Sequence, residues 1–430
     1  MSDPHEISDD DLTTANAVKP VRKLAFNAAA APTKTVFRAI RENLPADELR
    51  HYLKAAPLDG RDSDGLTYLH AAVAERNMTA LAILINAGCD LHAKIDGITP
   101  LMLCFAGQRM QDAALLLAKA DPHLSQHTLT GITPAHCAAE MYGYDRVLEA
   151  LLEHGIDPAA KDDKGRPPLY YALKKKYDTA FLLCNAGGCL PEDMPVLREA
   201  IATQEKTYGY DYDWNLLLDF AAKKDPVELR KALGVMKPQM PAELGKDAAE
   251  IFNAVRSHGG SSFRFEKYYT EATGLDLQDQ DGMTPLMAAI ENETGSDMWA
   301  VRPLSRHSPA DARDHAGRTA LHYAVMHTDN PAASIIDDLI GHGVDVDAQD
   351  NFGRTALMRT MRGGNHMHTL MEAGADPFIK DNLGLTAMDY GKLYKSDYCQ
   401  ELLAEQIKEH DWHEDEPKYK PYRYTRHDFP

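Results

Sequence analysis

The stretch DGITPLMLCF at residues 96–105 returns almost unchanged as DGMTPLMAAI at residues 281–290. Related phrases recur along the chain, each opened by a glycine that we call the anchor glycine. The eight anchor glycines are Gly65, Gly97, Gly131, Gly165, Gly282, Gly317, Gly353 and Gly384. The intervals between them are 32, 34, 34, 117, 35, 36 and 31 residues. Apart from the one long gap, this is a period of about 33 residues, which indicates a repeated structural unit.

A second phrase follows the first in several copies, as AGCDLHAK, HGIDPAAKD, HGVDVDAQD and AGADPFIKD. Apolar residues at helical spacing lie between the two phrases, for example Leu81, Leu84 and Ile85. The threonine after the anchor glycine suits a helix N-cap, and the proline that often follows suits the first helical turn. The glycine of the second phrase suits the left-handed residue that ends a helix. Each copy therefore predicts two short helices and a turn-rich hairpin.

These phrases resemble the ankyrin repeat, whose period and T-P-L-H signature they follow over most of the chain. The resemblance implies an all-α repeat solenoid, in which helix-turn-helix units with short β-hairpin or turn fingers stack on one another. Degenerate copies are interpreted at residues 36–65, 217–234 and 248–282. With these, we expect about eleven units, each of which needs its neighbours to bury its apolar face.

The expected organisation has five parts. An acidic disordered segment (1–33) precedes a first repeat block (34–188), and irregular repeats with an aromatic insertion (189–281) precede a second block (282–406). A flexible charged and aromatic tail (407–430) follows, read either as a simple disordered end or as a docking motif. We predict one elongated stack over residues 35–406, while the alternative of a small helical insert at 190–265 stays open.

Composition restricts the function. A formal net charge of −19 and a pI near 5.4 argue against broad binding to nucleic acid or to an anionic membrane. No apolar run is long enough to span a membrane, and no secretory signal is visible, so a cytoplasmic protein is expected. Export by a route independent of a signal peptide stays open.

The residues that suggest metal or redox chemistry have simpler interpretations. Cys184 and Cys189 form a lone C-x4-C, and all six cysteines are interpreted as buried small side chains. His366 and His368 do not share a helical face, and HDWHEDE (410–416) reads as an exposed acidic tail. We therefore expect no metal and no cofactor.

Three histidines occupy the histidine position of T-P-L-H, namely His70, His136 and His322. The resemblance implies that they bind the threonine hydroxyl and neighbouring backbone, which is a structural role. Other residues take this place at Met102, Tyr170, Met287, Met358 and Asp389. In those repeats the hydrogen bond is predicted to be lost, with side-chain packing in compensation.

Catalytic motifs are not recognisable, and too few residues lie outside the repeats to form a catalytic domain. The resemblance implies a non-enzymatic scaffold that binds another protein on its concave surface, as a monomer. The alternative is a regulatory subunit, inhibitor or adaptor of an enzyme system, of which a host-directed bacterial effector is one version. An enzyme in its own right would need a polar pocket near residues 189–215.

Two groups of residues are candidates for partner binding. The first is the aromatic segment TYGYDYDW, in which Tyr208, Tyr210 and Tyr212 are assigned to a partner and Trp214 to packing. The second is a basic stripe beside the hairpins: Arg166, Lys174, Lys175, Arg318, Arg354, Arg359 and Arg362. The alternative for these arginines is pairing with turn aspartates of adjacent units, where isolated surface pairs contribute little.

Overall fold

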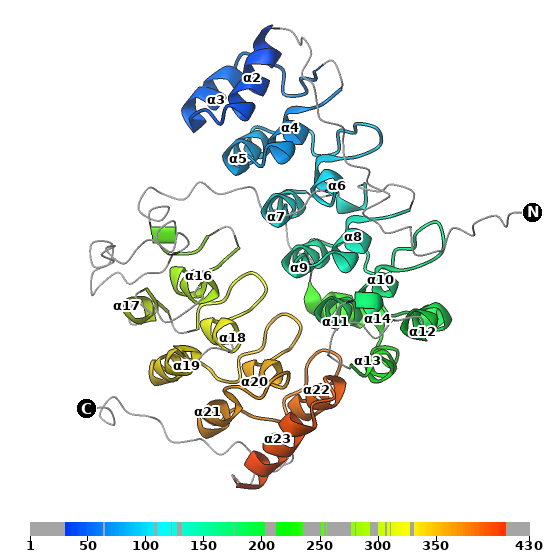
Figure 1. The fold of residues 1–430 in the computed structure, drawn as a ribbon, viewed down its shortest axis with the longest axis vertical. Coiled ribbons are helices and arrows are strands. Elements are labelled where there is room, and N and C mark those ends of the chain that lie inside the picture. The colour runs from blue at the N-terminus through cyan, green and yellow to red at the C-terminus, as the bar shows by residue number, and fades with distance from the viewer. Residues whose placement is uncertain are drawn as a thin grey trace, which may run out of the picture. The chain divides into compact units, whose positions relative to one another are not determined.

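Pairs of short antiparallel helices follow one another along the chain in the computed structural model (Figure 1). The structure describes these residues: 31–62, 65–106, 110–121, 123–126, 131–175, 177–202, 212–234, 251–252, 255, 277–279, 281–292, 300–305, 308–309, 311–326 and 331–409. The chain divides into two units, one made of residues 1–205 and 224–241, the other of residues 206–223 and 242–430.

The first unit holds two layers of helices. Its elements are α2 (Ala31–Arg41), α3 (Ala46–Leu53), α4 (Tyr68–Ala74), α5 (Met78–Asn86), α6 (Pro100–Cys104), α7 (Gln111–Ala120), η2 (Leu124–Gln126), α8 (Pro134–Glu140), α9 (Asp145–Glu153), α10 (Pro168–Lys175), α11 (Tyr177–Asn185), η3 (Pro191–Asp193), α12 (Met194–Ala202) and α14 (Pro226–Leu233). In one layer α4 packs between α2 and α6, and α10 between α8 and α12. In the other layer α7 packs between α5 and α9.

The second unit repeats this arrangement. Its elements are α13 (Trp214–Ala221), α16 (Pro285–Asn292), α17 (Val301–Ser305), α18 (Ala320–Ala324), α19 (Pro331–Gly341), α20 (Ala356–Thr360), α21 (Met367–Glu372), α22 (Ala387–Leu393) and α23 (Asp397–Glu409). Helix α18 packs between α16 and α20, and α19 between α17 and α21. Within the described residues, extended segments pair only as the isolated bridges Arg61–Thr67 and Ile95–Ile98. The fold is an all-α repeat solenoid, as predicted.

The predicted helix starts are confirmed. Thr99 lies in the extended region, and its hydroxyl accepts a hydrogen bond from the amide of Met102, while Pro100 occupies the first turn of α6. Thr67 caps α4 in the same way. The threonine hydroxyl satisfies an amide that the helix leaves without a carbonyl partner.

The anchor glycines mark the hairpins because each has a positive φ, between +73° and +85°. Gly353 shows why a side chain is excluded as well: a Cβ there would lie 2.8 Å from the backbone nitrogen of Asn382 in the next hairpin. The hairpins therefore stack backbone to backbone, and glycine is required at this point of the repeat.

An aspartate three residues before the anchor glycine closes the hairpin. In Asp350, Oδ1 accepts from the amide of Arg354 at 2.9 Å, and the backbone carbonyl accepts from the amide of Gly353 at 2.8 Å. The same carboxylate contact to the residue after the anchor glycine recurs at Asp62, Asp162, Asp279, Asp314 and Asp381. The turn assignments made from the sequence are thus given a common mechanism.

The irregular region contains the helix pair expected at residues 217–234, as α13 and α14. The two helices belong to different units. Helix α14 lies in the first unit, as α12 does, and α13 lies in the second. Helix α12 packs on α10, and α13 packs on α22. Residues 190–265 therefore do not form a unit of their own in their described part. One continuous stack over residues 35–406 concerns the placement of the two units and stays a prediction.

Both chain ends predicted to be disordered lie almost entirely outside the described residues. The described chain begins at Ala31, where α2 starts three residues before the predicted repeat block, and ends at Glu409 within α23.

Leu339 of α19 tests the phase of the second helices, because its side chain is only 2% exposed. Leu339→Ala should lower the free energy of unfolding by roughly 2–5 kcal/mol, as truncation of buried leucines does. Urea unfolding followed by circular dichroism measures this loss. Val227→Ala is the matched control, because Val227 is 56% exposed, and it should change stability by less than about 0.5 kcal/mol. Equal losses at both positions would mean that α19 is placed in the wrong phase.

Candidate partner-binding surface

Each of the three histidines joins two consecutive repeats. In His136, Nδ1 lies 2.9 Å from Thr133 Oγ1 and accepts from the Thr133 amide at 3.1 Å, while Nε2 lies 3.1 Å from the carbonyl oxygen of Arg166 in the next repeat. His322 makes the same contacts to Thr319 and to the carbonyl of Arg354. Since Nδ1 accepts, the ring proton is on Nε2 and is donated across the repeat boundary.

Burial keeps these imidazoles neutral. Burial lowers the pKa of His70 and of His322 to about 4, and it lowers the pKa of His136 as well. A neutral ring is what the geometry requires, because only a neutral imidazole can accept at Nδ1 and donate at Nε2. The structural role predicted for the three histidines is confirmed by these contacts.

The prediction that other residues at this place lose the hydrogen bond is wrong for Asp389. Its Oδ2 accepts from the Thr386 amide at 3.1 Å and from the Thr386 hydroxyl at 2.9 Å. A carboxylate has the acceptors that the capping box needs, so Asp389 restores the local half of the contact. Met358 offers only its sulfur, which lies 3.5 Å from the Thr355 amide.

A second buried cluster lies at the base of several hairpins. In the repeat of Gly317, the Arg318 guanidinium donates to Asp314 Oδ2 at 2.8 Å, and the Tyr323 hydroxyl donates to the same oxygen at 2.6 Å. The repeat of Gly165 builds the same cluster from Asp162, Arg166 and Tyr171. The arginine also stacks on the tyrosine ring in both repeats. The sequence signal is an aspartate, an arginine and a tyrosine at fixed offsets from the anchor glycine.

The charge of this cluster depends on the arginine. Burial opposes ionisation of Asp350, but Arg354 and Arg359 outweigh it and hold the pKa of Asp350 below its ordinary value. Asp381 occupies the same place in the last hairpin, where Leu385 replaces the arginine, and burial raises the pKa of Asp381 to about 7. The arginines are therefore part of the framework of the hairpin.

This finding bears on the predicted basic stripe. Arg318 and Arg354 are each only 8% exposed and are each paired with an aspartate of their own hairpin. Arg359 lies 3.5 Å from Asp350. Arg362 is exposed. The structure thus does not gather the predicted arginines into one accessible stripe, and partner contact by them stays a prediction.

The repeat of Gly165 combines basic and aromatic side chains at the surface. Arg166 lies 5.3 Å and Lys174 4.8 Å from the ring centre of Tyr170. All three side chains are half-buried. The Tyr170 ring is thus partly exposed and lies near two cations, one from a residue before it in the sequence and one from a residue after it. The side chain of Lys175 lies outside the described residues.

The structure describes only part of the aromatic insertion. Tyr208 and Tyr210 lie outside the described residues. Tyr212 packs against Trp214 and against Tyr394, with ring centres 5.3 Å and 6.0 Å apart, and the amide of Asp213 donates to the carbonyl of Leu393. Trp214 is buried. Residues 212–214 thus cover the end of α22, in agreement with a packing role for Trp214.

Sequence reasoning missed a ladder of polar side chains along the hairpins. Arg313 donates to the carbonyls of Gly317 and Gln349, so it ties its own hairpin to the next one. Gln349 continues the ladder to Gly353 and Lys380. Arg61 and Gln278 make the equivalent pair of bonds in their repeats. The signal was a long polar residue four places before the anchor glycine.

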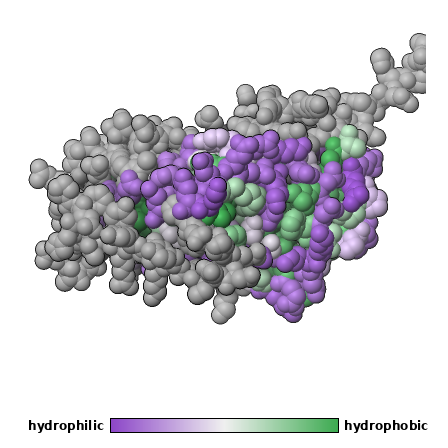
Figure 2. All heavy atoms as spheres, turned by 90° about the horizontal axis from the view of Figure 1, so that it is seen from below, coloured by the Kyte–Doolittle hydropathy of each residue, from purple (hydrophilic) through white to green (hydrophobic). Residues whose placement is uncertain are grey.

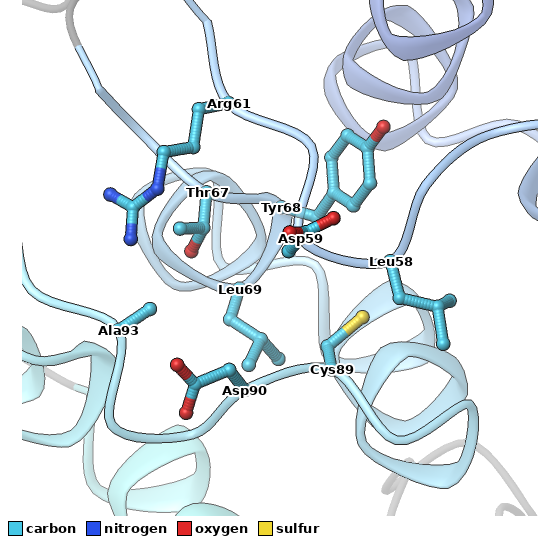
Figure 3. Close-up of a pocket in the computed structure, with 9 residues that line it drawn as sticks. All are labelled: Leu58, Asp59, Arg61, Thr67, Tyr68, Leu69, Cys89, Asp90 and Ala93. Atoms are coloured by element: carbon cyan, nitrogen blue, oxygen red, sulfur yellow. The ribbon is translucent and has the colours of Figure 1, made fainter.

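A pocket of about 20 Å³ lies between the first repeats, where Figure 3 shows Cys89 between Leu58 and Leu69. It has room for roughly one water molecule. No group of His, Cys, Asp or Glu in the described part of the chain has the arrangement of a metal site. His366 is the residue before α21, whereas His368 lies within α21 and pairs with Glu372. No described helix is long and apolar enough to cross a membrane.

Comparison with known proteins agrees with this geometry. The family of ankyrin repeats (3 copies) matches residues 108–193 and 251–336. The chain is 34% identical over 120 residues to the mouse nuclear factor NF-kappa-B p105 subunit and 25% identical over 334 residues to the Arabidopsis thaliana E3 ubiquitin-protein ligase KEG. It is 31% identical over 121 residues to a putative ankyrin repeat-containing protein of Treponema pallidum.

These alignments cover 27%, 76% and 27% of this chain, and 12%, 18% and 39% of the three relatives. The chain thus spans only a minor part of each relative. Together with the stacked helix pairs, the matches show ankyrin repeats in residues 108–193 and 251–336 and support an ankyrin repeat protein. The number of eleven repeats stays a prediction.

Acid should unfold the repeats through the bridging histidines. The unfolded chain takes up protons near pH 6.5, but folded His322 does so only near pH 4, so stability is lost as the pH falls through this window. The loss at His322 should reach about 3 kcal/mol. His322→Met, the residue found at this place in other repeats, should be less stable by about 1–3 kcal/mol at pH 7 and should approach the wild type near pH 4.

Urea midpoints of both proteins between pH 7 and pH 4 measure the effect, with the exposed His368→Met as control. The raised pKa of Asp381 acts in the opposite direction in both proteins and cancels in their difference. Parallel pH profiles for the wild type and His322→Met would contradict a buried neutral imidazole.

Arg318 should stabilise the fold. Arg318→Gln leaves the buried Asp314 carboxylate without its cation, and the expected loss is roughly 3–5 kcal/mol. Arg362→Gln is the matched control on an exposed arginine, with an expected change below about 0.5 kcal/mol. Thermal and urea unfolding compare the two. An Arg318→Gln protein as stable as the wild type would contradict the structural role assigned to Arg318.

Proposed function

We propose that this protein is a non-enzymatic scaffold that binds another protein on the surface formed by its hairpins and first helices. The supporting observation is a division of labour within each repeat. The threonine that caps the first helix is nearly constant from repeat to repeat and buried, as at Thr67, Thr99, Thr319 and Thr355. Ankyrin repeats in general are protein-interaction modules, and a constant frame with a varied surface suits such a role.

The varied surface lies at the end of the first helices. The residue nine places after each of the first seven anchor glycines is exposed or half-buried, and these residues differ in size and charge: Ala74, Ala106, Glu140, Lys174, Glu291, Met326 and Arg362. At the eighth repeat the place is taken by Leu393, which is fully buried and whose carbonyl accepts from Asp213. Variation at accessible positions is what recognition of a specific partner needs.

Within this surface, we assign the strongest contact to Tyr170 with Lys174 and Arg166. Contacts with two cations restrict the rotamers of the Tyr170 ring before a partner arrives, so the ring is pre-organised for binding. Tyrosine and arginine are enriched among residues that dominate binding energy. Lys175, Tyr208 and Tyr210 remain candidates from the sequence, as do Arg359 and Arg362. Arg318 and Arg354 are assigned an indirect role, because they shape the hairpins that present this surface.

Among the residues coloured in Figure 2, hydrophilic ones predominate, with hydrophobic ones in narrow strips between them. Such a surface suits a partner that binds through polar and aromatic contacts. The alternative, a regulatory subunit or adaptor of an enzyme system, uses the same surface and differs only in the partner. The relatives offer both contexts by name, a nuclear factor subunit and a ubiquitin ligase.

Affinity capture with surface variants tests the proposal. The variants are Lys174→Glu, Met326→Glu and Arg362→Glu, each made singly in the full chain. Matched controls lie on second helices: Lys231→Glu in α14 and Lys408→Glu in α23, both exposed. Quantitative mass spectrometry should find one protein that is reduced about tenfold with at least one of the three surface variants and is retained with both controls. A tenfold reduction in affinity corresponds to about 1.4 kcal/mol.

Circular dichroism must show that every variant is folded. If all three surface variants retain every captured protein, or if the controls lose the same protein equally, the assigned surface is wrong. The identity of the captured protein decides between a general scaffold and an adaptor of an enzyme.

A further inference from the structure

Two cysteines meet where α11 ends. The helix closes with a left-handed glycine: the amide of Gly187 donates to the carbonyl of Cys184 at 3.1 Å, and the amide of Gly188 donates to Leu183 at 2.8 Å. This turn reverses the chain within a few residues. Cys189, the first residue after the turn, is thereby returned to the last turn of the helix, where Cys184 lies.

The two thiols are in hydrogen-bonding contact with each other. Cys189 Sγ also lies 3.9 Å from Met194 Sδ, so three sulfur atoms share this corner of the first unit. Both cysteines are free thiols and are buried, Cys184 fully and Cys189 to within 2% exposure. Exposed Pro191 lies two residues after Cys189, so Cys189 is the thiol closer along the chain to exposed residues.

The repeat framework does not explain Cys189. Other repeats place an aspartate here, and its carboxylate accepts from the amide two residues on, as Asp157 does from Ala159 and Asp376 from Phe378. In this repeat the residue two places on is Pro191, which has no amide hydrogen. An aspartate at this place would therefore have no amide to bind. This explains why the aspartate is absent, but it does not explain why a cysteine stands opposite Cys184.

We propose that Cys184 and Cys189 form a dithiol that hydrogen peroxide oxidises to an intramolecular disulfide. In the first step Cys189, as thiolate, attacks one peroxide oxygen; the O–O bond breaks, one water leaves, and Cys189 becomes a sulfenic acid. In the second step the Cys184 sulfur attacks Cys189 Sγ, the S–O bond breaks, and a second water leaves with the remaining protons. Two thiols lose two electrons and two protons in total, and one peroxide becomes two waters.

The assignment of roles follows from the local electrostatics. The hydrogen bond from Cys184 lowers the pKa of Cys189, against the effects of burial and of Asp193. The same hydrogen bond, together with burial, raises the pKa of Cys184. A thiolate is the reactive form of cysteine, so Cys189 attacks first and Cys184 resolves the sulfenic acid.

The disulfide would fix a turn that supports another helix. A Cβ on Gly187 would lie 2.7 Å from the carbonyl oxygen of Pro226, so the first turn of α14 rests directly on this turn. Arg230 of α14 pairs with Asp157 nearby in the same unit. The bond joins residues 184 and 189 and leaves the rest of the first unit unchanged.

The chain offers a direct test, because one tryptic peptide, residues 177–198, contains both cysteines and ends at its only basic residue, Arg198. The reduced, folded full-length protein is exposed to hydrogen peroxide, quenched with N-ethylmaleimide, denatured and digested. We expect the form of this peptide that has lost both alkylation sites and two hydrogens to appear at least tenfold faster than Cys104 and Cys137 lose their alkylation sites. These two cysteines lie on other peptides and are the internal controls. Cys184→Ser should stop at a Cys189 sulfenic acid that dimedone traps.

Two thiols that stay alkylatable while the control cysteines oxidise would overturn the proposal, as would a disulfide that forms only after unfolding in urea. Equal oxidation of Cys184 in Cys189→Ser would overturn the order of attack. The wild-type peptide decides on its own, so a cysteine variant that fails to fold leaves the test intact.

Discussion

The structure depends on contacts that hold each repeat to the next hairpin, and in three repeats a histidine Nε2 makes this contact by donating to the carbonyl of that hairpin. His136 caps its own helix through Thr133 and holds the backbone of Arg166 in the following repeat. A single side chain therefore fixes the start of one helix and the position of the next hairpin. Because no repeat can bury its own apolar face, stability resides in such boundaries. The polar ladder of Arg313 and Gln349 repeats the same principle at the hairpin tips.

This constraint separates framework from function. Charges near the hairpin base are used internally, since Arg318 and Asp314 neutralise each other below the surface. The proposed recognition surface uses positions where the repeats differ, above all the ends of the first helices. The Cys184–Cys189 turn is a further departure from the repeat: a place where a general aspartate is lost and a reactive pair is proposed to take its position. In both cases function is assigned where the repeat pattern is not needed for stacking.

Much of the fold could be predicted from the sequence, because glycine, threonine, proline and histidine each have a local physical reason to occupy their places. Gly353 needs a positive φ and Thr99 caps a helix whatever surrounds them. Long-range arrangements could not be predicted in this way. The docking of α13 on α22, for example, joins residues far apart in sequence. The pairing of Arg318 with Asp314 is local, and its fixed spacing was a signal that the prediction of a basic stripe did not use. The error at Asp389 arose because a carboxylate was not considered as a substitute acceptor.

The protonation of the bridging histidines tests the central claim most directly. Long-range ¹H–¹⁵N correlation spectra of the imidazole rings distinguish the two neutral tautomers and the charged form. At pH 5.5 the account predicts that His70 and His322 are neutral and carry their proton on Nε2, because burial lowers both pKa values to about 4. A proton on Nδ1, or a charged ring at this pH, would contradict the bridge between repeats.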